Sequence, residues 1–527
     1  NGAVGGITPI GSMHRLLRAP SSATSDGALP TTLSRASIPV AELRNVALGD
    51  DLLTAEIENL APRLPNRARN GLLWSLSGFG DTSRSLLERS LVEVAPSGEA
   101  EGLAGELVPG SAVAGVLVGG DLRLAVTGTV TERAGDGILA FGHAFLGQGP
   151  IRLPMATAEV VTVLSNQFSS FKIANLGQVV GAFDLDMSSG VRGRVGRSVE
   201  TIPMTVAVSG LGSASFDMEL ADVPAYLPTL AAVASLGAFD TTSRSGGAQG
   251  VDLNVRWQLE RHGTVEVSQS FDGRGAGFSV ATYLLLFTNF LVNNAFEETR
   301  LESVSIDLVQ HPVPRIARIL GGFASRSAVR PGESVDLTLE IQPYRGDSYQ
   351  QRMDVALPRD LPEGRYSLIV GDGVTVDTVR QMVEQVEPQT LSQSLDMINR
   401  FHSNRDLVVI GLVPASGLTL SGKVLPQLPG SMRQLWGAAP LGAVRPLGLA
   451  VVQEVVVPQE TPLTGGVRID IDVRQPTTTS MQPTPPAATG GRWVSGGPVH
   501  GAVVPTPARA AELLVGPTSD EKPEEPK

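Results

Sequence analysis

The chain has 527 residues, a formal net charge of −12 and no cysteine. This length exceeds a single hydrophobic core and predicts roughly three or four domains. The lack of cysteine excludes disulfides, thiolate metal sites and cysteine nucleophiles, and fits a bacterial envelope or secreted protein. The acidic balance, without any basic block, predicts no nucleic-acid partner. High Gly (59) and Pro (37) with 5% aromatic residues favour many short strands joined by tight turns.

The first residues are rich in Gly, Ser and Ala, and only Met13–Leu17 has the pattern of a helical turn. The chain starts without a methionine and without the basic and apolar segments of a signal peptide. We therefore expect a fragment or a processed product.

A β-hairpin is predicted next, and it leads to the first candidate site residue. Asp121–Thr131 alternates apolar and polar residues, Ala134–Gly137 has turn composition, and Ile138–Phe141 is the predicted return strand. His143 follows directly. A histidine at a strand end is both rigidly held and exposed, so it suits a general base. The alternative is a structural histidine bonded to the backbone.

Further strands are predicted at Thr157–Leu164, which the β-branched residues mark as buried, and at Phe171–Ile173, Val179–Phe183 and Thr201–Val208. Glycines 190, 193 and 196 allow tight turns or a close approach of another segment.

The chain beyond is predicted to be mixed. A helix is expected at Leu227–Leu236 and a strand at Val251–Leu259. Phe278–Phe296 is apolar, but polar residues interrupt it, so we expect a buried helix rather than a membrane span. Val313–Gly417 has the composition of a β-sandwich, with a helical appendage at Thr378–Phe401. The Pro- and Thr-rich tail after Gln475 is predicted to be disordered.

The segments around His143 resemble the SpoIVB-type serine peptidase family. The resemblance rests on LAFGH (Leu139–His143), on LPMATAEVVTVL (Leu153–Leu164), on Gln178–Gly196, and on PGSAVAGVLVGGDLRLAVTGTVT (Pro109–Thr131). Together these segments cover roughly residues 105 to 208. The resemblance implies a serine peptidase in which His143 is the catalytic base.

The nucleophile expected from the resemblance is missing. The family places its serine in a Met-Ser-Gly-Ser-Pro-like motif, and neither this motif nor a Gly-x-Ser-x-Gly elbow occurs in the chain. We interpret Ser77, Ser416 and Ser421 as turn residues. Gly5–Ile10 resembles the segment that follows the nucleophile strand, so we expect the serine upstream of Asn1. An inactive homologue fits the same facts. A strand at Gly6–Ile10 close to His143 favours the first interpretation.

The acid that orients His143 is expected before the glycine-spaced loop, where Asp184 and Asp186 both lie. We prefer Asp186 because it is nearer the loop, although a solvated carboxylate is an equal alternative. Arg192, Arg194 and Arg197 either pair with these carboxylates or only solvate the loop. The scattered histidines show no metal spacing, so neither metal nor cofactor is expected.

These observations lead to two hypotheses. The first is a periplasmic or secreted serine endopeptidase acting on protein substrates or on itself, with no nucleic-acid partner and no integral membrane segment. The second is a non-catalytic envelope scaffold or binding protein with a peptidase-like fold. The expected fold is mainly β, with a chymotrypsin-like or barrel-like domain, an α+β insert and an immunoglobulin-like sandwich. The predicted parts are a remnant (1–37), a peptidase domain (38–208), an α+β region (209–312), a sandwich (313–417), a β region (418–475) and a tail (476–527).

Overall fold

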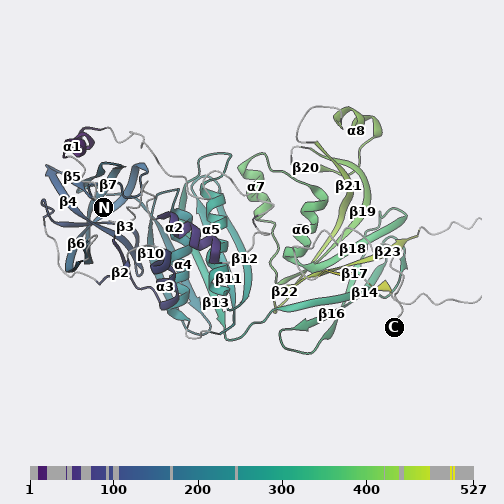
Figure 1. Ribbon diagram of the computed structural model, residues 1–527. Coiled ribbons are helices and arrows are strands. Elements are labelled where there is room, and N and C mark those ends of the chain that lie inside the picture. Colours follow the sequence, from purple (N-terminus) through teal and green to yellow (C-terminus); the bar gives the residue numbers. More distant parts are fainter. Residues whose placement is uncertain are drawn as a thin grey trace, which may run out of the picture. The chain divides into compact units, whose positions relative to one another are not determined.

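The computed structural model is mainly β (Figure 1). By their contacts the residues form two compact units, one made mostly of the chain up to Val313 and the other of the chain from Pro314. The six-part division drawn from the sequence stays a prediction. The structure describes residues 10–19, 43, 50–60, 73–90, 94–98, 106–165, 170–243, 247–420, 422–437, 444–474, 499–500 and 502–504.

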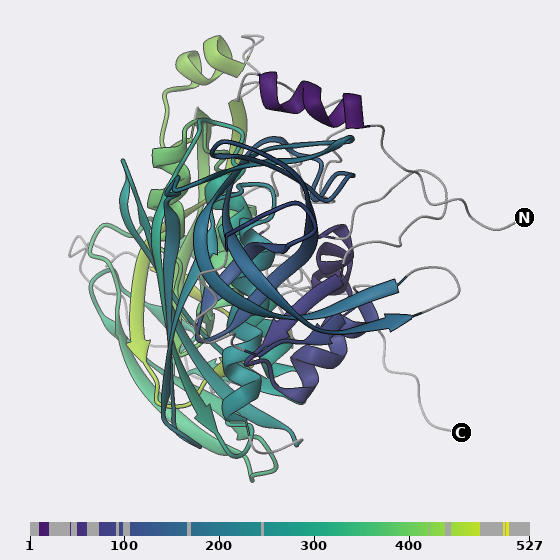
Figure 2. The ribbon, with the colours of Figure 1, turned by 90° about the vertical axis from the view of Figure 1, so that its left-hand side faces the viewer.

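Six strands of the first unit pair in a closed ring, so this part is barrel-like (Figure 2). The predicted hairpin is confirmed, because β4 and β5 pair antiparallel around the turn at Gly135 and Asp136. The ring closes because β3 pairs with both β4 and β6. In order around the ring, the strands are β3 (Ala112–Gly120), β6 (Gly149–Ser165), β7 (Ser170–Met187), β8 (Gly190–Val195), β5 (Gly137–Ala140) and β4 (Arg123–Ala134).

Aromatic rings pack inside this part against glycines. The ring of Phe141 lies 5.9 Å from that of Phe183, centroid to centroid. A Cβ atom on Gly128 would stand 2.6 Å from the Phe141 ring, and one on Gly193 would stand 2.8 Å from Phe183. These glycines therefore make room for the aromatic side chains, and the close approach expected for the 190–196 glycines is confirmed at Gly193.

The hairpin of β6 and β7 is longer and more exposed than expected. The two predicted strands at 171–173 and 179–183 are parts of the single strand β7. The predicted burial of Thr157–Leu164 is wrong, since Val161 is 58% exposed and Val163 is 49% exposed. The hairpin projects beyond the other strands (Figure 2), so its β-branched residues mark strand propensity and not burial.

The same sheet continues beyond the ring on both sides. β9 pairs with β10 antiparallel and with β13 in parallel, and β1 pairs with β4. The predicted strands at Thr201–Val208 and Val251–Leu259 are confirmed as β9 and β11. The added strands are β1 (Leu73–Ser77), β2 (Val94–Pro96), β9 (Thr201–Ser209), β10 (Ala214–Ala221), β11 (Gln249–Leu259), β12 (Gly263–Gly273) and β13 (Leu301–His311).

Two buried helices, α4 (Leu227–Thr242) and α5 (Ala276–Val292), lie side by side against this sheet (Figure 1). Both predicted helices are thus confirmed. They are apolar on nearly all sides because α2 (Asp50–Leu60) and α3 (Asp81–Ser90) pack on them as well. The polar Thr288 of α5 accepts a hydrogen bond from Trp257 at 3.0 Å. In the part of the chain that the structure describes, no helix is long and apolar enough to cross a membrane.

The second unit holds two β-sheets that share one hydrophobic core, as expected of a sandwich. This core also includes residues from Leu447 to Val473, which lie beyond the predicted end of the sandwich at Gly417. One sheet contains β14 (Ala317–Ala324), β16 (Ser334–Pro343), β17 (Tyr349–Ala356), β22 (Leu463–Thr464) and β24 (Val499–His500). The other contains β15 (Ala328–Val329), β18 (Gly364–Asp372), β19 (Asp406–Leu420), β20 (Lys423–Leu425), β21 (Val444–Pro458), β23 (Gly466–Val473) and β25 (Ala502–Val504).

The helical appendage of this unit consists of α6 (Gly373–Glu384) and α7 (Leu391–Ile398), and α8 (Gly430–Gly437) follows later. Valines of α6 pack on the outer face of β18 and β19. The predicted disorder of the tail is wrong at β24 and β25, which pair with β14 and β23. The rest of the predicted tail, from Pro476, lies outside the described residues.

Candidate histidine site at the end of strand β5

His143 lies in the loop between β5 and β6, Phe141–Gln148, which we call the His143 loop. The loop turns sharply at its start, where Phe141 has φ 70° and Gly142 has φ 75°. A positive φ costs a non-glycine residue about 1 kcal/mol or more. Packing of the Phe141 ring on Phe145 and Phe183 and a hydrogen bond from its amide to the Thr129 carbonyl (3.1 Å) offset this cost. The turn therefore fixes the direction in which the backbone enters His143.

The imidazole of His143 is half-buried and is bonded to the backbone of the next residue. Its Nδ1 lies 2.7 Å from the carbonyl oxygen of Ala144. Because a carbonyl oxygen only accepts, Nδ1 must carry the proton, and the lone pair of the neutral ring is then on Nε2. The Phe141 ring lies edge-on at 6.1 Å. This is the tautomer that a general base needs if Nε2 is to take the proton.

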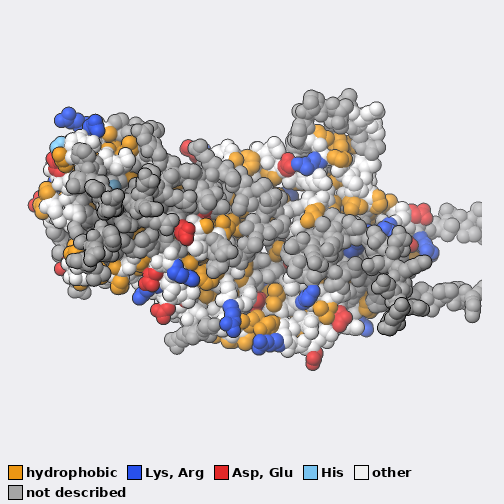
Figure 3. All heavy atoms as spheres, viewed as in Figure 1, with side chains coloured by type: hydrophobic (Ala, Val, Ile, Leu, Met, Phe, Trp, Pro, Cys, Tyr) orange, Lys and Arg blue, Asp and Glu red, His pale blue; other side chains and the backbone are white. Residues whose placement is uncertain are grey.

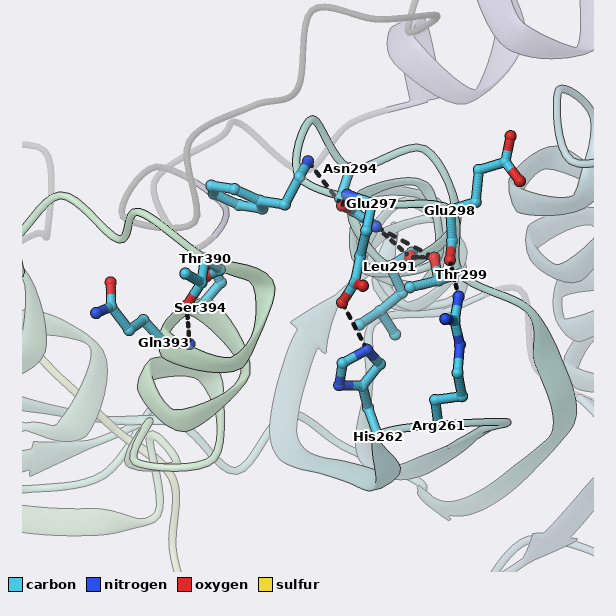
Figure 4. A network of polar contacts seen from close by, with 11 residues as sticks. Arg261, His262, Leu291, Asn294, Glu297, Glu298, Thr299, Thr390, Gln393 and Ser394 are labelled. Atoms are coloured by element: carbon cyan, nitrogen blue, oxygen red, sulfur yellow. Dashed lines mark hydrogen bonds and ion pairs between the residues drawn. The ribbon is translucent and has the colours of Figure 1, made fainter.

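The other histidines whose side chains are described differ from His143, since each contacts a carboxylate. His262 lies 2.7 Å from Glu297 in the turn after α5, as Figure 4 shows. His311 contacts Asp252 at 2.9 Å, His402 contacts Asp377 at 2.8 Å, and His14 contacts Glu132. His143 is therefore distinguished by a backbone partner.

Asp186, the predicted acid, lies directly beneath the His143 loop and is fully buried. Its carboxylate accepts hydrogen bonds from three successive amides, those of Phe145 (2.8 Å), Leu146 (2.5 Å) and Gly147 (2.7 Å). Burial raises the pKa of Asp186 to about 6, although these amide hydrogen bonds lower it. Among the contacts of the described residues, none joins Asp186 to the imidazole directly. Its role as the acid of the site stays a prediction.

Tyr226 also contacts the His143 loop, through its hydroxyl. Its hydroxyl donates to the Leu146 carbonyl at 3.4 Å and accepts from the side-chain amide of Gln148 at 3.3 Å. Burial raises the pKa of Tyr226 to about 12, and the charge of Asp186 adds to the rise. The sequence reasoning missed Tyr226, Gln148 and the loop amides. The glycines at 142, 147 and 149 were the available signal, because glycine-rich loops present successive amides to an anion.

Asp184, the alternative acid, belongs to a different cluster. It is buried and contacts Arg192 at 2.7 Å, Arg194 at 3.3 Å and Arg197 at 3.0 Å. Of the two readings of these arginines, pairing with carboxylates is confirmed for Asp184. Among their described contacts, none is with Asp186.

The buried Arg192 also connects this cluster to helix α1 (Ile10–Arg18). Its Nη1 donates to the carbonyl of Leu16 at 2.7 Å and to that of Ala19. The helix packs with Met13 and Leu16 on Leu139 of β5. The helical turn predicted at Met13–Leu17 is confirmed. The strand considered at Gly6–Ile10 is wrong at Ile10, which begins α1, and residues 6–9 lie outside the described part of the chain.

The described residues provide neither a nucleophile bonded to His143 nor a metal site. Ser77 ends strand β1 and Ser416 lies within β19, so their prediction as turn residues is wrong; Ser421 is outside the described residues. No serine or threonine with a described side chain is bonded to His143. Nor do the described residues contain a group of three or more His, Asp or Glu suited to a metal ion.

A groove of about 660 Å³ lies elsewhere on the first unit, with Gly119, Pro154 and Met204 in its lining. His143 is not among its lining residues. Among the side chains coloured by type in Figure 3, acidic and basic ones are interspersed.

Comparison with known proteins adds no relative: the chain matches no family model, no curated protein and no solved structure.

Proposed function

We propose that this protein is a serine peptidase of the SpoIVB type, with His143 as the general base. One observation carries the proposal. The Ala144 carbonyl holds the proton on Nδ1, which leaves Nε2 as the acceptor at a half-buried position. A serine hydroxyl is a poor nucleophile until such an acceptor removes its proton.

The remaining parts of the proposal follow from the sequence. As the resemblance implies, the nucleophile comes from a segment outside the described residues. The barrel-like part is chymotrypsin-like and the sandwich immunoglobulin-like. The protein acts in the periplasm or outside the cell, on protein or peptide substrates or on itself.

The test is labelling with a fluorophosphonate probe of the protein made from its complete coding sequence. We expect labelling of the wild type, loss of labelling in His143→Ala, and retention in His262→Ala. The last variant is a matched control because His262 is a half-buried histidine paired with a carboxylate. Equal labelling of all three proteins contradicts the proposal.

A second candidate is a non-catalytic scaffold or binding protein, and the environment of Asp186 favours it. This carboxylate is occupied by loop amides instead of by the imidazole. Absence of labelling in the folded, full-length wild type is the result that this candidate predicts.

A further inference from the structure

A single peptide group separates His143 from Asp186. The carbonyl oxygen of Ala144 accepts from His143 Nδ1 at 2.7 Å, and the amide of Phe145 donates to Asp186 Oδ1 at 2.8 Å. These two atoms belong to the same peptide bond. A trans peptide is planar, and its C=O and N–H point in opposite directions. The imidazole and the carboxylate are therefore bonded to opposite edges of one rigid peptide group.

Hydrogen bonds on the two sides of such a peptide strengthen each other. A negative charge at the N–H end polarises the group and makes its carbonyl oxygen a better acceptor. The effect is large where water is excluded, and Asp186 is fully buried. The better acceptor in turn favours the Nδ1–H form of the imidazole and any positive charge that the ring gains.

We infer that Asp186 is the positioning residue of the site and acts on His143 through the Ala144–Phe145 peptide, in the place where a triad has a direct carboxylate contact. The amides of Leu146 and Gly147 donate to the second carboxylate oxygen, Oδ2, and so hold the carboxylate in place at the N–H end of the peptide. The catalytic meaning of the inference rests on the proposed function, whereas the coupling itself does not.

Other ionisable groups near Asp186 also act on the coupling between Asp186 and His143. Tyr226 shares the pocket through Leu146 and Gln148, and Glu56 of α2 contributes a further negative charge to its surroundings. Tyr226 stays neutral below its raised pKa of about 12. Between pH 5 and 8 the ionisation of Asp186, with a pKa of about 6, is therefore the change expected to reach the peptide from its N–H end, whereas protonation of the imidazole acts at the carbonyl end.

The test is nitrogen-15 NMR of the full chain labelled in histidine, which reports the protonated ring nitrogen of each imidazole. At pH 8 we expect His143 in the Nδ1–H form in the wild type and loss of this preference in Asp186→Asn. Asp184→Asn is the matched control, because Asp184 is a buried carboxylate two residues earlier on β7. It should leave the His143 signal unchanged.

A second measurement covers the case in which Asp186→Asn does not fold. In the wild type, the amide protons of Phe145, Leu146 and Gly147 report Asp186 directly, so their shifts between pH 8 and 5 should move together. The His143 Nδ1 proton should include a step at the same midpoint, separate from the change that protonation of the imidazole itself causes. A His143 signal without this step, or an equal response to both Asp variants, overturns the inference.

These outcomes are separate from those of the probe labelling. If NMR shows the coupling but the probe does not label the protein, the inference about the peptide stands and the peptidase proposal is refuted. If the probe labels the protein in a way that depends on His143 but NMR shows no coupling, the peptidase proposal stands and the positioning role of Asp186 is refuted.

Discussion

Asp186 is an ionisable side chain that the fold stabilises in its neutral form. Its pKa is about 6 in the folded protein and near 3.8 when solvated, because burial outweighs the hydrogen bonds from the loop amides. The folded state thus binds more protons than the unfolded state between these two values. It follows that this group makes the protein more stable as the pH falls from 7 towards 4.

The direction of this pH dependence gives a prediction that is specific to a carboxyl group with a raised pKa. Acidification from pH 7 to 5 should stabilise the wild type relative to Asp186→Asn by about 1 kcal/mol. The measurement is the free energy of unfolding from urea titrations of both proteins at the two pH values. A difference that is constant with pH, or that shrinks on acidification, contradicts the raised pKa.

Gly128 is the residue on which the Phe141 turn depends. An alanine Cβ would stand 2.6 Å from the Phe141 ring, which the surrounding aromatic rings hold in place. Gly128→Ala should therefore destabilise the protein by about 1–3 kcal/mol. Gly119→Ala in β3 is the control, since its Cβ would meet its nearest atom at 3.6 Å. Similar unfolding free energies for the two variants would refute this packing account.

At this scale the sequence predicted His143 but not its partners. Alternation and turn composition identify the hairpin, so the position of His143 at its end follows. The contact between Asp186 and the amides of residues 145–147 cannot be predicted from the sequence, because it depends on where the loop folds back over β7. Backbone groups carry no sequence signature apart from the glycines that free them.

At the scale of elements, α1 is held on the barrel-like part by the buried Arg192. The guanidinium neutralises Asp184 and also binds carbonyls at the C-terminal end of the helix, where positive charge is favourable. The sequence placed the three arginines near two carboxylates but left their pairing open. Residues two apart on a regular strand face the same side, so the pattern alone does not separate the two carboxylates. The strand is irregular between Phe183 and Leu185, and no sequence pattern reveals this shift.

Arg192→Ala should destabilise the protein by about 3 kcal/mol, because Asp184 loses its buried partner. It should also expose α1 to trypsin at Arg15 and Arg18. Arg194→Ala is the matched control: this arginine contacts the same carboxylate but is 52% exposed, so its loss should cost less than about 1 kcal/mol. Urea titration and limited proteolysis measure both effects. An equal response of the two variants would show that burial of Arg192 is not what retains the helix.

Elements with a clear alternation or a long apolar run were predicted well, and those with mixed signals were not. The hairpin of β4 and β5 and the apolar helices α4 and α5 were all identified. The exposed hairpin of β6 and β7 was misread as buried, because valines favour strands whether or not they are covered. Strand propensity and burial are different properties, and composition reports only the first.

At the scale of the molecule, the first unit joins a ring of six strands to a sheet covered by buried helices, and the second is a sandwich with its own core. The sequence predicted mostly β structure because glycine and proline are abundant. It did not reveal that β9 to β13 continue the sheet of the ring, since strand partners distant in sequence leave no local pattern. The mainly β character is thus confirmed, while the finer fold assignments stay proposals.

The most direct test of the central claim, that His143 is a general base, is to map the fluorophosphonate adduct by mass spectrometry in the full-length protein. We predict one modified serine, outside the residues that the structure describes, and no adduct in His143→Ala. An adduct on a serine that the structure describes, such as Ser416, or an adduct that persists without the histidine, would contradict the claim.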